Sequence, residues 1–108
     1  MGSTPAVAPK ILERDGYRCV YCGIDVEDAP LTVDHLTPPS WFERGAAEGD
    51  PDDPTNLVAC CGPCNSLKRD LNFRLFADYL RAARLWTTED VRELTRRVNN
   101  ARRRRLPA

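Results

Sequence analysis

Apolar residues in the second half of the chain recur at the spacing of amphipathic helices. They form two series whose members lie three or four positions apart, with one closer pair: Phe73, Phe76, Ala77, Leu80 and Ala83, then Val91, Leu94, Val98 and Ala101. Because this spacing places each series on one face of a helix, we predict two helices whose apolar faces pack on a core. Thr87 with Asp90 three residues later is the pattern of a capping box, which predicts that the second helix begins there.

The first half of the chain shows two short strand patterns instead. Leu31 to Asp34 alternates around β-branched residues, which predicts a strand that delivers His35 at its end. Asn56 to Cys60 predicts a second strand. Pro63 suits the first turn of a helix, and that helix would contain Asn65. The unit that emerges is strand, strand, helix.

Three further segments flank or connect this unit. Residues 1–9 are expected to form a short disordered lead. Lys10 to Asp15 favours a short helix that ends at Gly16, because glycine tolerates the left-handed backbone at a helix end. Residues 37–55 contain four prolines and form a long loop, within which Ser40 is expected to cap a brief helix. We therefore divide the chain into a lead (1–9), a core (10–69) and a helical extension with a basic tail (70–108).

Composition limits the possible classes of protein. The chain has 108 residues, of which 42% are hydrophobic, and this length predicts about one domain with a modest core. It contains no apolar run of about 18 residues and no export signal in its first residues, so we expect no membrane partner and a cytoplasmic location. In a reducing compartment, the five cysteines favour metal ligation over disulfides.

Four of these cysteines form two pairs with the spacing of a zinc site. The pairs are Cys19 with Cys22 and Cys61 with Cys64. Four thiolates at this spacing can close a tetrahedral shell around structural zinc. Cys60 is left over, and we expect it to be a buried free thiol.

The net charge of zero hides two opposed halves. Residues 1–60 carry four basic and eleven acidic side chains, whereas residues 61–108 carry twelve basic and five acidic ones. Such a basic half can attract phosphate. The candidate nucleic-acid contacts are Lys68, Arg69, Arg96, Arg97, Arg102 and Arg103. Two alternatives stay open: Lys68 contacts phosphate or is a solvated lysine, and the terminal arginine run binds nucleic acid or is a solvated end.

Three segments together resemble one known family. Asp15 to Gly23 holds the first cysteine pair, Val33 to Pro38 holds an Asp-His dipeptide, and Asn56 to Lys68 holds an Asn-Leu strand start, the second cysteine pair and Asn65. In this order they look like an HNH endonuclease of the zinc-bearing ββα-metal type, over about residues 11 to 69. Asn65 stands where the family commonly has histidine, so the chain resembles an H-N-N form. The implied fold is a small α+β unit stapled by the four cysteines.

The resemblance implies hydrolysis of a phosphodiester with one divalent ion. Asp34 and Asn65 would hold Mg²⁺ or Mn²⁺, because both ions prefer oxygen ligands and keep several waters. His35 would be the general base, since a neutral imidazole can accept a proton from water; the alternative is a structural or zinc-ligating histidine. Asn56 would brace the loop between the strands and so hold the histidine.

We therefore expect a metal-dependent endonuclease that hydrolyses DNA, one strand per active site. The alternative is a non-catalytic zinc-ribbon module that binds nucleic acid or a protein through its arginine-rich helices. Everything except Asp34, His35 and Asn65 fits that alternative equally well. The pattern does not fix the sequence preference, the choice of DNA or RNA, a nick or a double-strand break, or the oligomeric state.

Overall fold

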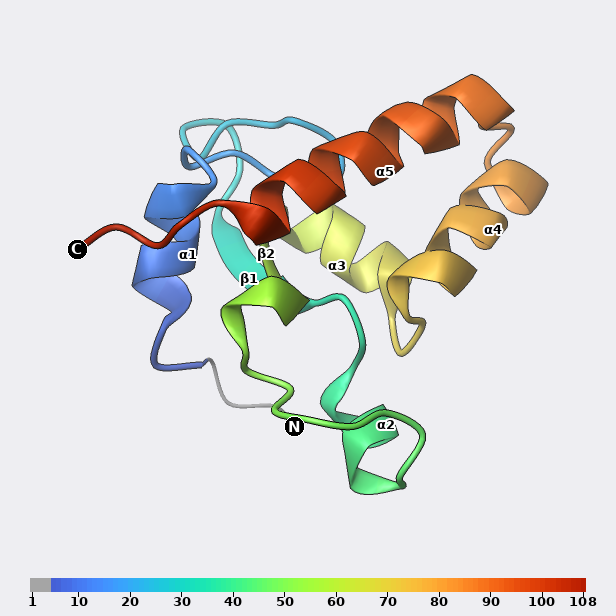
Figure 1. Ribbon diagram of the computed structural model, residues 1–108. Helices are drawn as coiled ribbons and strands as arrows, with labels where there is room; N and C mark the ends of the chain where they lie inside the picture. Colours follow the sequence, from blue (N-terminus) through green and yellow to red (C-terminus); the bar gives the residue numbers. More distant parts are fainter. Residues whose placement is uncertain (1–4) are drawn as a thin grey trace.

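A two-stranded antiparallel sheet lies at the centre of the computed structural model, which describes residues 5–108 (Figure 1). Strand β1 is Leu31–His35 and strand β2 is Leu57–Cys61, with Leu31 opposite Cys61 and His35 opposite Leu57. Every residue of β2 is buried, which explains why its sequence is continuously apolar rather than alternating. The strands agree with the predicted ones to within one residue at each end.

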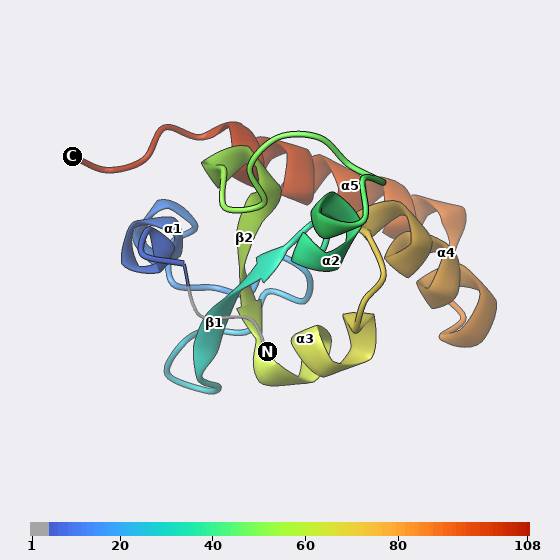
Figure 2. The same cartoon turned by 90° about the horizontal axis from the view of Figure 1, so that it is seen from below.

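Helices cover both faces of this sheet. Helix α1 (Ala8–Arg14) lies on one face, where Ile11 packs with Val33 and Leu57 in a small apolar cluster (Figure 2). The larger apolar cluster lies on the other face, under α3 (Gly62–Lys68), α4 (Phe73–Ala83) and α5 (Thr88–Arg103). The sheet is therefore buried although it has only two strands.

The start of the chain differs in part from the expectation. The first four residues of the predicted disordered lead lie outside the described residues. Helix α1 begins at Ala8, two residues before the predicted start, because Pro9 sits in its first turn, where an amide hydrogen is not needed. The helix ends as expected before Gly16, whose φ is 71°. Asp15 then accepts a 2.8 Å hydrogen bond from the Ala59 amide and ties this end to β2.

The predicted amphipathic helices α4 and α5 are confirmed. Their apolar faces bury Phe76, Ala77 and Leu80, and Leu94, Val98 and Ala101, respectively. The capping box is also confirmed, since the Asp90 amide donates to Thr87 Oγ1 at 3.0 Å and the Thr87 amide donates to Asp90 Oδ2 at 2.8 Å. These two exchanged bonds fix the first turn of α5.

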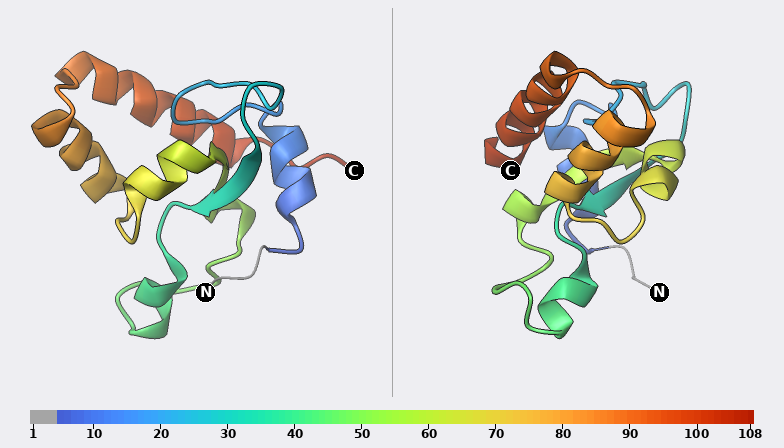
Figure 3. Two further views of the ribbon diagram at one scale, coloured as in Figure 1. Left: turned by 180° about the vertical axis from the view of Figure 1, so that it is seen from behind. Right: turned by 90° about the vertical axis from the view of Figure 1, so that its right-hand side faces the viewer.

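The long connection between the strands contains a short helix, α2 (Pro39–Glu43), and a 3-10 turn, η1 (Pro54–Asn56). The predicted cap at Ser40 is wrong: Pro38 is the residue before the helix, and no side chain caps it. Proline at the start supplies the helical φ without a cap. Figure 3 shows this connection extending away from the sheet and from the α4–α5 pair.

The element order confirms the predicted α+β class with a strand, strand, helix unit, β1–β2–α3. Among the described residues, no helix combines the length and apolar character needed to cross a membrane.

Candidate functional site

The four paired cysteines meet at the end of the sheet where β2 runs into α3. The sulfurs of Cys19, Cys22, Cys61 and Cys64 all lie within 4.8 Å of one another. A tetrahedral zinc shell with Zn–S bonds of about 2.3 Å requires sulfur–sulfur separations of about 3.8 Å, and the Cys22 and Cys61 sulfurs are 3.7 Å apart. The donor set and its spacing therefore fit a closed zinc site, and the fold is of the ββα-metal type.

Cys60 is the buried free thiol that the sequence predicts. It is fully buried and does not belong to the group of four sulfurs. Its thiol donates to the carbonyl oxygen of Cys61 at 3.3 Å. The contact with Cys19, together with burial, raises the pKa of Cys60 above its ordinary value.

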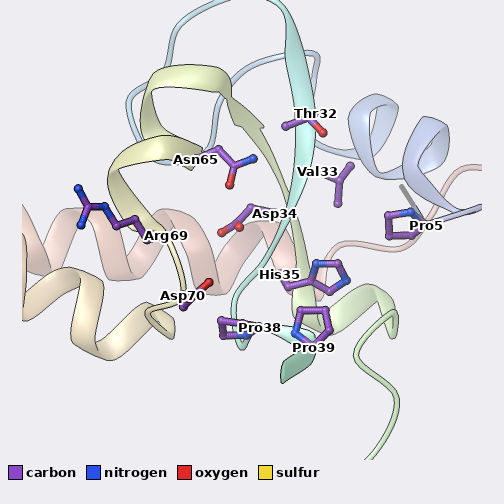
Figure 4. Close-up of a pocket in the computed structure, with 10 residues that line it drawn as sticks. All are labelled: Pro5, Thr32, Val33, Asp34, His35, Pro38, Pro39, Asn65, Arg69 and Asp70. Carbon is purple, nitrogen blue, oxygen red and sulfur yellow. The ribbon is translucent and has the colours of Figure 1, made fainter. Parts of the chain in front are cut away.

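The other candidate residues line a pocket of about 320 Å³ between β1, α3 and the start of α2. Asp34, His35 and Asn65 all contribute to its wall, together with Arg69. Figure 4 shows the Asp34 carboxylate and the Asn65 amide pointing toward one another on the α3 side of β1. The His35 ring lies on another wall, because neighbouring strand residues project to opposite faces. The fold thus brings the three residues to one pocket.

One buried hydrogen bond and one buried ion pair hold the Asp34 carboxylate, and both reach the same oxygen. The Tyr21 hydroxyl donates to Asp34 Oδ2 at 2.6 Å, and the Lys68 ammonium lies 3.0 Å from it. Burial, with the negative charge of Asp34, raises the pKa of Tyr21 well above its ordinary value, so Tyr21 remains a donor. Among the described residues, no group bonds Asp34 Oδ1. Asp34 lines the pocket, so this oxygen could serve as a ligand atom there.

The position of Lys68 differs from both alternatives that the sequence left open. Its side chain is completely buried, so it is neither a solvated lysine nor part of an exposed nucleic-acid surface. Besides the ion pair with Asp34, its ammonium donates to the His35 carbonyl oxygen at 2.7 Å. Position 68 on α3 faces β1, and the cation is buried because a carboxylate and a carbonyl meet it there.

The His35 imidazole has a carboxylate partner that the sequence did not indicate. His35 Nε2 lies 2.8 Å from Asp52 Oδ1, and the two side chains are 15% and 52% exposed. Asp52 belongs to the connection between the strands, beyond α2 in sequence. The four cysteines are grouped elsewhere without His35, which removes the alternative of a zinc-ligating histidine.

Asn56 holds the connection between the strands closed. Its Oδ1 accepts from the Thr37 amide at 2.9 Å, and its Nδ2 donates to the carbonyl oxygens of Thr37 and Pro51 at 3.0 and 2.9 Å. All three bonds go to backbone, so the side chain serves as a brace across the base of the loop, one residue before Leu57, which lies opposite His35.

The predicted nucleic-acid arginines fall into two groups. Arg97 donates to the Val20 and Tyr21 carbonyl oxygens, and Arg102 donates to the Thr55 carbonyl oxygen at 2.7 Å, so both have structural partners. Arg96 pairs with Glu93 on the exposed face of α5. Arg69 and Arg103 are exposed, and Arg69 alone of the predicted set lines the pocket.

Sequence reasoning missed Tyr21 and Asp52. Tyr21 lies between the first two cysteines, where nothing in the spacing indicates contact with Asp34. A signal for Asp52 existed, since the run Asp50-Pro51-Asp52-Asp53 is typical of turns in which aspartates bond nearby amides.

Comparisons with known proteins point to the family that the sequence resembles. Residues 19–71 match the model of a family described as HNH endonuclease. Among solved structures, the chain is similar to the crystal structure of the Type II-C Cas9 enzyme from Actinomyces naeslundii, with 27% identity and a TM-score of 0.50. The match covers 92% of this chain and 12% of that one, so the chain spans only a small part of its neighbour. No curated protein matches the chain.

Proposed function

Because residues 19–71 match the HNH endonuclease family model, we propose that this protein is a metal-dependent endonuclease that hydrolyses phosphodiester bonds of DNA. The observation that carries the proposal is the pocket in which Asp34, His35 and Asn65 meet. A binding module would need no carboxylate that is fixed at one oxygen while its other oxygen is left for a ligand.

The donor set of the pocket fits a hard divalent cation. Asp34 Oδ1 and the Asn65 amide oxygen are the ligands that we assign to Mg²⁺ or Mn²⁺. Such an ion, when bound, supplies positive charge to the scissile phosphate and the leaving oxygen. Tyr21 and Lys68 keep the carboxylate from rotating, so Oδ1 faces the pocket. A single carboxylate that is already paired with the Lys68 ammonium would bind a divalent ion only weakly. We therefore expect oxygen atoms of the substrate phosphate to supply further ligands.

His35 is the residue to which we assign the general base. It accepts a proton from the water that attacks the phosphorus atom, and its place at the end of β1 limits its motion. Lys68 holds the carbonyl oxygen of the same residue, which fixes the backbone from which the imidazole projects. Arg69 is the pocket cation that we expect to contact a phosphate, with bidentate geometry available to its guanidinium.

The test is a plasmid-nicking assay with wild-type protein and His35→Ala. We expect wild type to cut supercoiled plasmid only when Mg²⁺ or Mn²⁺ is present. The product should be nicked circles, since one active site cuts one strand. We expect His35→Ala to be about 10²- to 10⁴-fold slower, the usual contribution of a general base. The variant should stay folded, because the ring belongs to neither apolar cluster, and circular dichroism checks this.

Two outcomes would contradict the proposal. Full activity of a folded His35→Ala protein would exclude the histidine as base. DNA binding by wild type without metal-dependent nicking would favour the non-catalytic zinc-ribbon module instead. Parallel arms with single-stranded DNA and RNA identify the substrate.

A further inference from the structure

The contact between His35 and Asp52 joins the last residue of β1 to a residue of the connection between the strands, 17 positions later. A surface ion pair of this kind contributes about 0–1 kcal/mol to stability, so folding alone gives little reason for it. The contact matters for chemistry because it involves one particular ring nitrogen, Nε2. Among the described residues, no donor meets the other ring nitrogen, Nδ1.

The segment that carries Asp52 is held in place by hydrogen bonds other than the contact with His35. The Asp52 amide donates to Asp50 Oδ1 at 2.9 Å, and the Asn56 side chain holds the carbonyl of the adjacent Pro51 at 2.9 Å. On the other side, Asp53 accepts from the amide and hydroxyl of Thr55. Because local bonds order the backbone on both sides of Asp52, the carboxylate reaches His35 without the cost of ordering a free loop.

A carboxylate can only accept hydrogen bonds, so its position selects one form of the neutral imidazole. With Asp52 Oδ1 at 2.8 Å, the hydrogen of the ring is on Nε2 and the lone pair is on Nδ1. We propose that Asp52 is a positioning residue that fixes the tautomer and the plane of His35, so that Nδ1 accepts the proton of the attacking water. In that step an O–H bond of water breaks, an N–H bond at Nδ1 forms, and the hydroxide attacks phosphorus; the P–O bond to the leaving oxygen then breaks, and that oxygen takes up a proton from solvent.

This inference deepens the proposed function and rests on it for the catalytic meaning of His35. It also gives Asn56 a further task, because the amide that braces the loop holds the residue next to Asp52. The chain of contacts runs from Asn56 to Pro51, through the backbone to Asp52, and from there to the imidazole. The brace and the base are thus parts of one arrangement.

The inference is tested with Asp52→Ala and a matched control, Glu48→Ala. The control removes an equally negative, exposed side chain from the same connection, and its carboxylate has no hydrogen-bond partner among the described residues. Asp52 is half exposed and its side chain bonds only His35 among those residues. Both variants should therefore fold as wild type does, which thermal melts followed by circular dichroism will show.

The first measurement does not depend on activity. His35 is the only histidine in the chain, so its ring nitrogens give one set of signals in a ¹H–¹⁵N correlation spectrum. At a pH where the ring is neutral, we expect wild type and Glu48→Ala to show hydrogen on Nε2. Asp52→Ala should show a mixture of both tautomers. An unchanged tautomer in Asp52→Ala overturns the inference whatever the activity.

The second measurement separates positioning from binding. We expect kcat for metal-dependent plasmid nicking to fall about 10- to 100-fold in Asp52→Ala, the usual loss when the outer partner of a functional histidine is removed. KM should stay within twofold of wild type, and Glu48→Ala should keep both constants. A wild-type kcat in Asp52→Ala overturns the positioning role. A wild-type protein that has the expected tautomer but does not nick DNA overturns the proposed function and, with it, the catalytic role of Asp52, while the hydrogen bond stands.

Discussion

Replacing Lys68 by methionine removes the buried cation beneath the candidate site and keeps the length of the side chain. The Lys68 side chain is 0% exposed and that of Asp34 is 9% exposed, with 3.0 Å between the ammonium and Oδ2. In Lys68→Met the Asp34 carboxylate stays buried, with only the Tyr21 hydroxyl as a partner. The His35 carbonyl oxygen also loses its donor.

The size of the effect follows from these contacts. Removing one partner of a buried ion pair destabilises a protein by about 3–5 kcal/mol, because the remaining charge is left uncompensated. The lost hydrogen bond from the ammonium to the His35 carbonyl oxygen, worth about 1.5–3 kcal/mol because its donor is charged, acts in the same direction. For a domain of this size each kcal/mol lowers the melting temperature by about 4 °C. We therefore expect Lys68→Met to melt at least about 12 °C below wild type.

The assay is a double-mutant cycle measured by urea unfolding with zinc in excess. Lys68→Met and Asp34→Asn should each be strongly destabilising, whereas the double variant has no buried charge left and should recover at least about 2 kcal/mol relative to the sum of the two single effects. A cost below about 1 kcal/mol for Lys68→Met, or single effects that add within about 0.5 kcal/mol, would refute the buried ion pair. Lys68 would then be the solvated lysine of the sequence-based alternative.

The cysteine cluster and the cap of α5 give two more predictions. Cys22→Ser should lose bound zinc and the circular dichroism of the folded state, because a structural metal contributes folding energy. The control variant Cys60→Ala should retain one zinc per chain. A Cys22→Ser protein that is free of zinc but still folded would contradict the structural role of the metal. Thr87→Ala should lower the free energy of unfolding by about 1 kcal/mol in urea, and no change would contradict the cap. Hydrogen bonds from the backbone and the side chain of Thr87 lower the pKa of Asp90, so the stabilisation that the Asp90 carboxylate contributes is present above the pKa of unfolded aspartate and is lost as the pH falls through the lower folded value. The difference in stability between wild type and Asp90→Asn should therefore shrink in acid.

The elements that the sequence predicts well are those specified by short-range patterns. Alternation in Leu31–His35, the apolar run in Leu57–Cys61 and the capping pair at the start of α5 each depend on residues a few positions apart. The four-cysteine cluster is also predictable. The two cysteines of each pair are only three positions apart, so a single approach of the two pairs completes the set of four sulfurs. The prediction of a helix cap at Ser40 fails because two local preferences compete there. Serine favours a cap position, but the prolines just before it already start the helix.

The environment of the candidate site is less predictable because it depends on contacts between distant residues. Helical spacing places Lys68 on the same side of α3 as Asn65 but does not show what lies opposite. Lysine is almost never fully buried unless it is paired, so sequence reasoning places it at the surface. Its burial follows from a carbonyl 33 positions away and from Asp34 on the same strand. The contact of Asp52 with His35 depends likewise on how the connection folds back on β1.

Tyr21 connects the cysteine cluster to the pocket, although the two sites have different chemical roles. The residue lies between two of the cysteines, and its ring packs against Phe73 and Phe76 while its hydroxyl reaches Asp34. Arg97 of α5 holds the carbonyl of the same residue at 2.9 Å. A change in the cysteine turn therefore moves a donor that sets the direction of the Asp34 carboxylate. The geometry of the cysteine cluster is therefore coupled, through Tyr21, to the orientation of the Asp34 carboxylate.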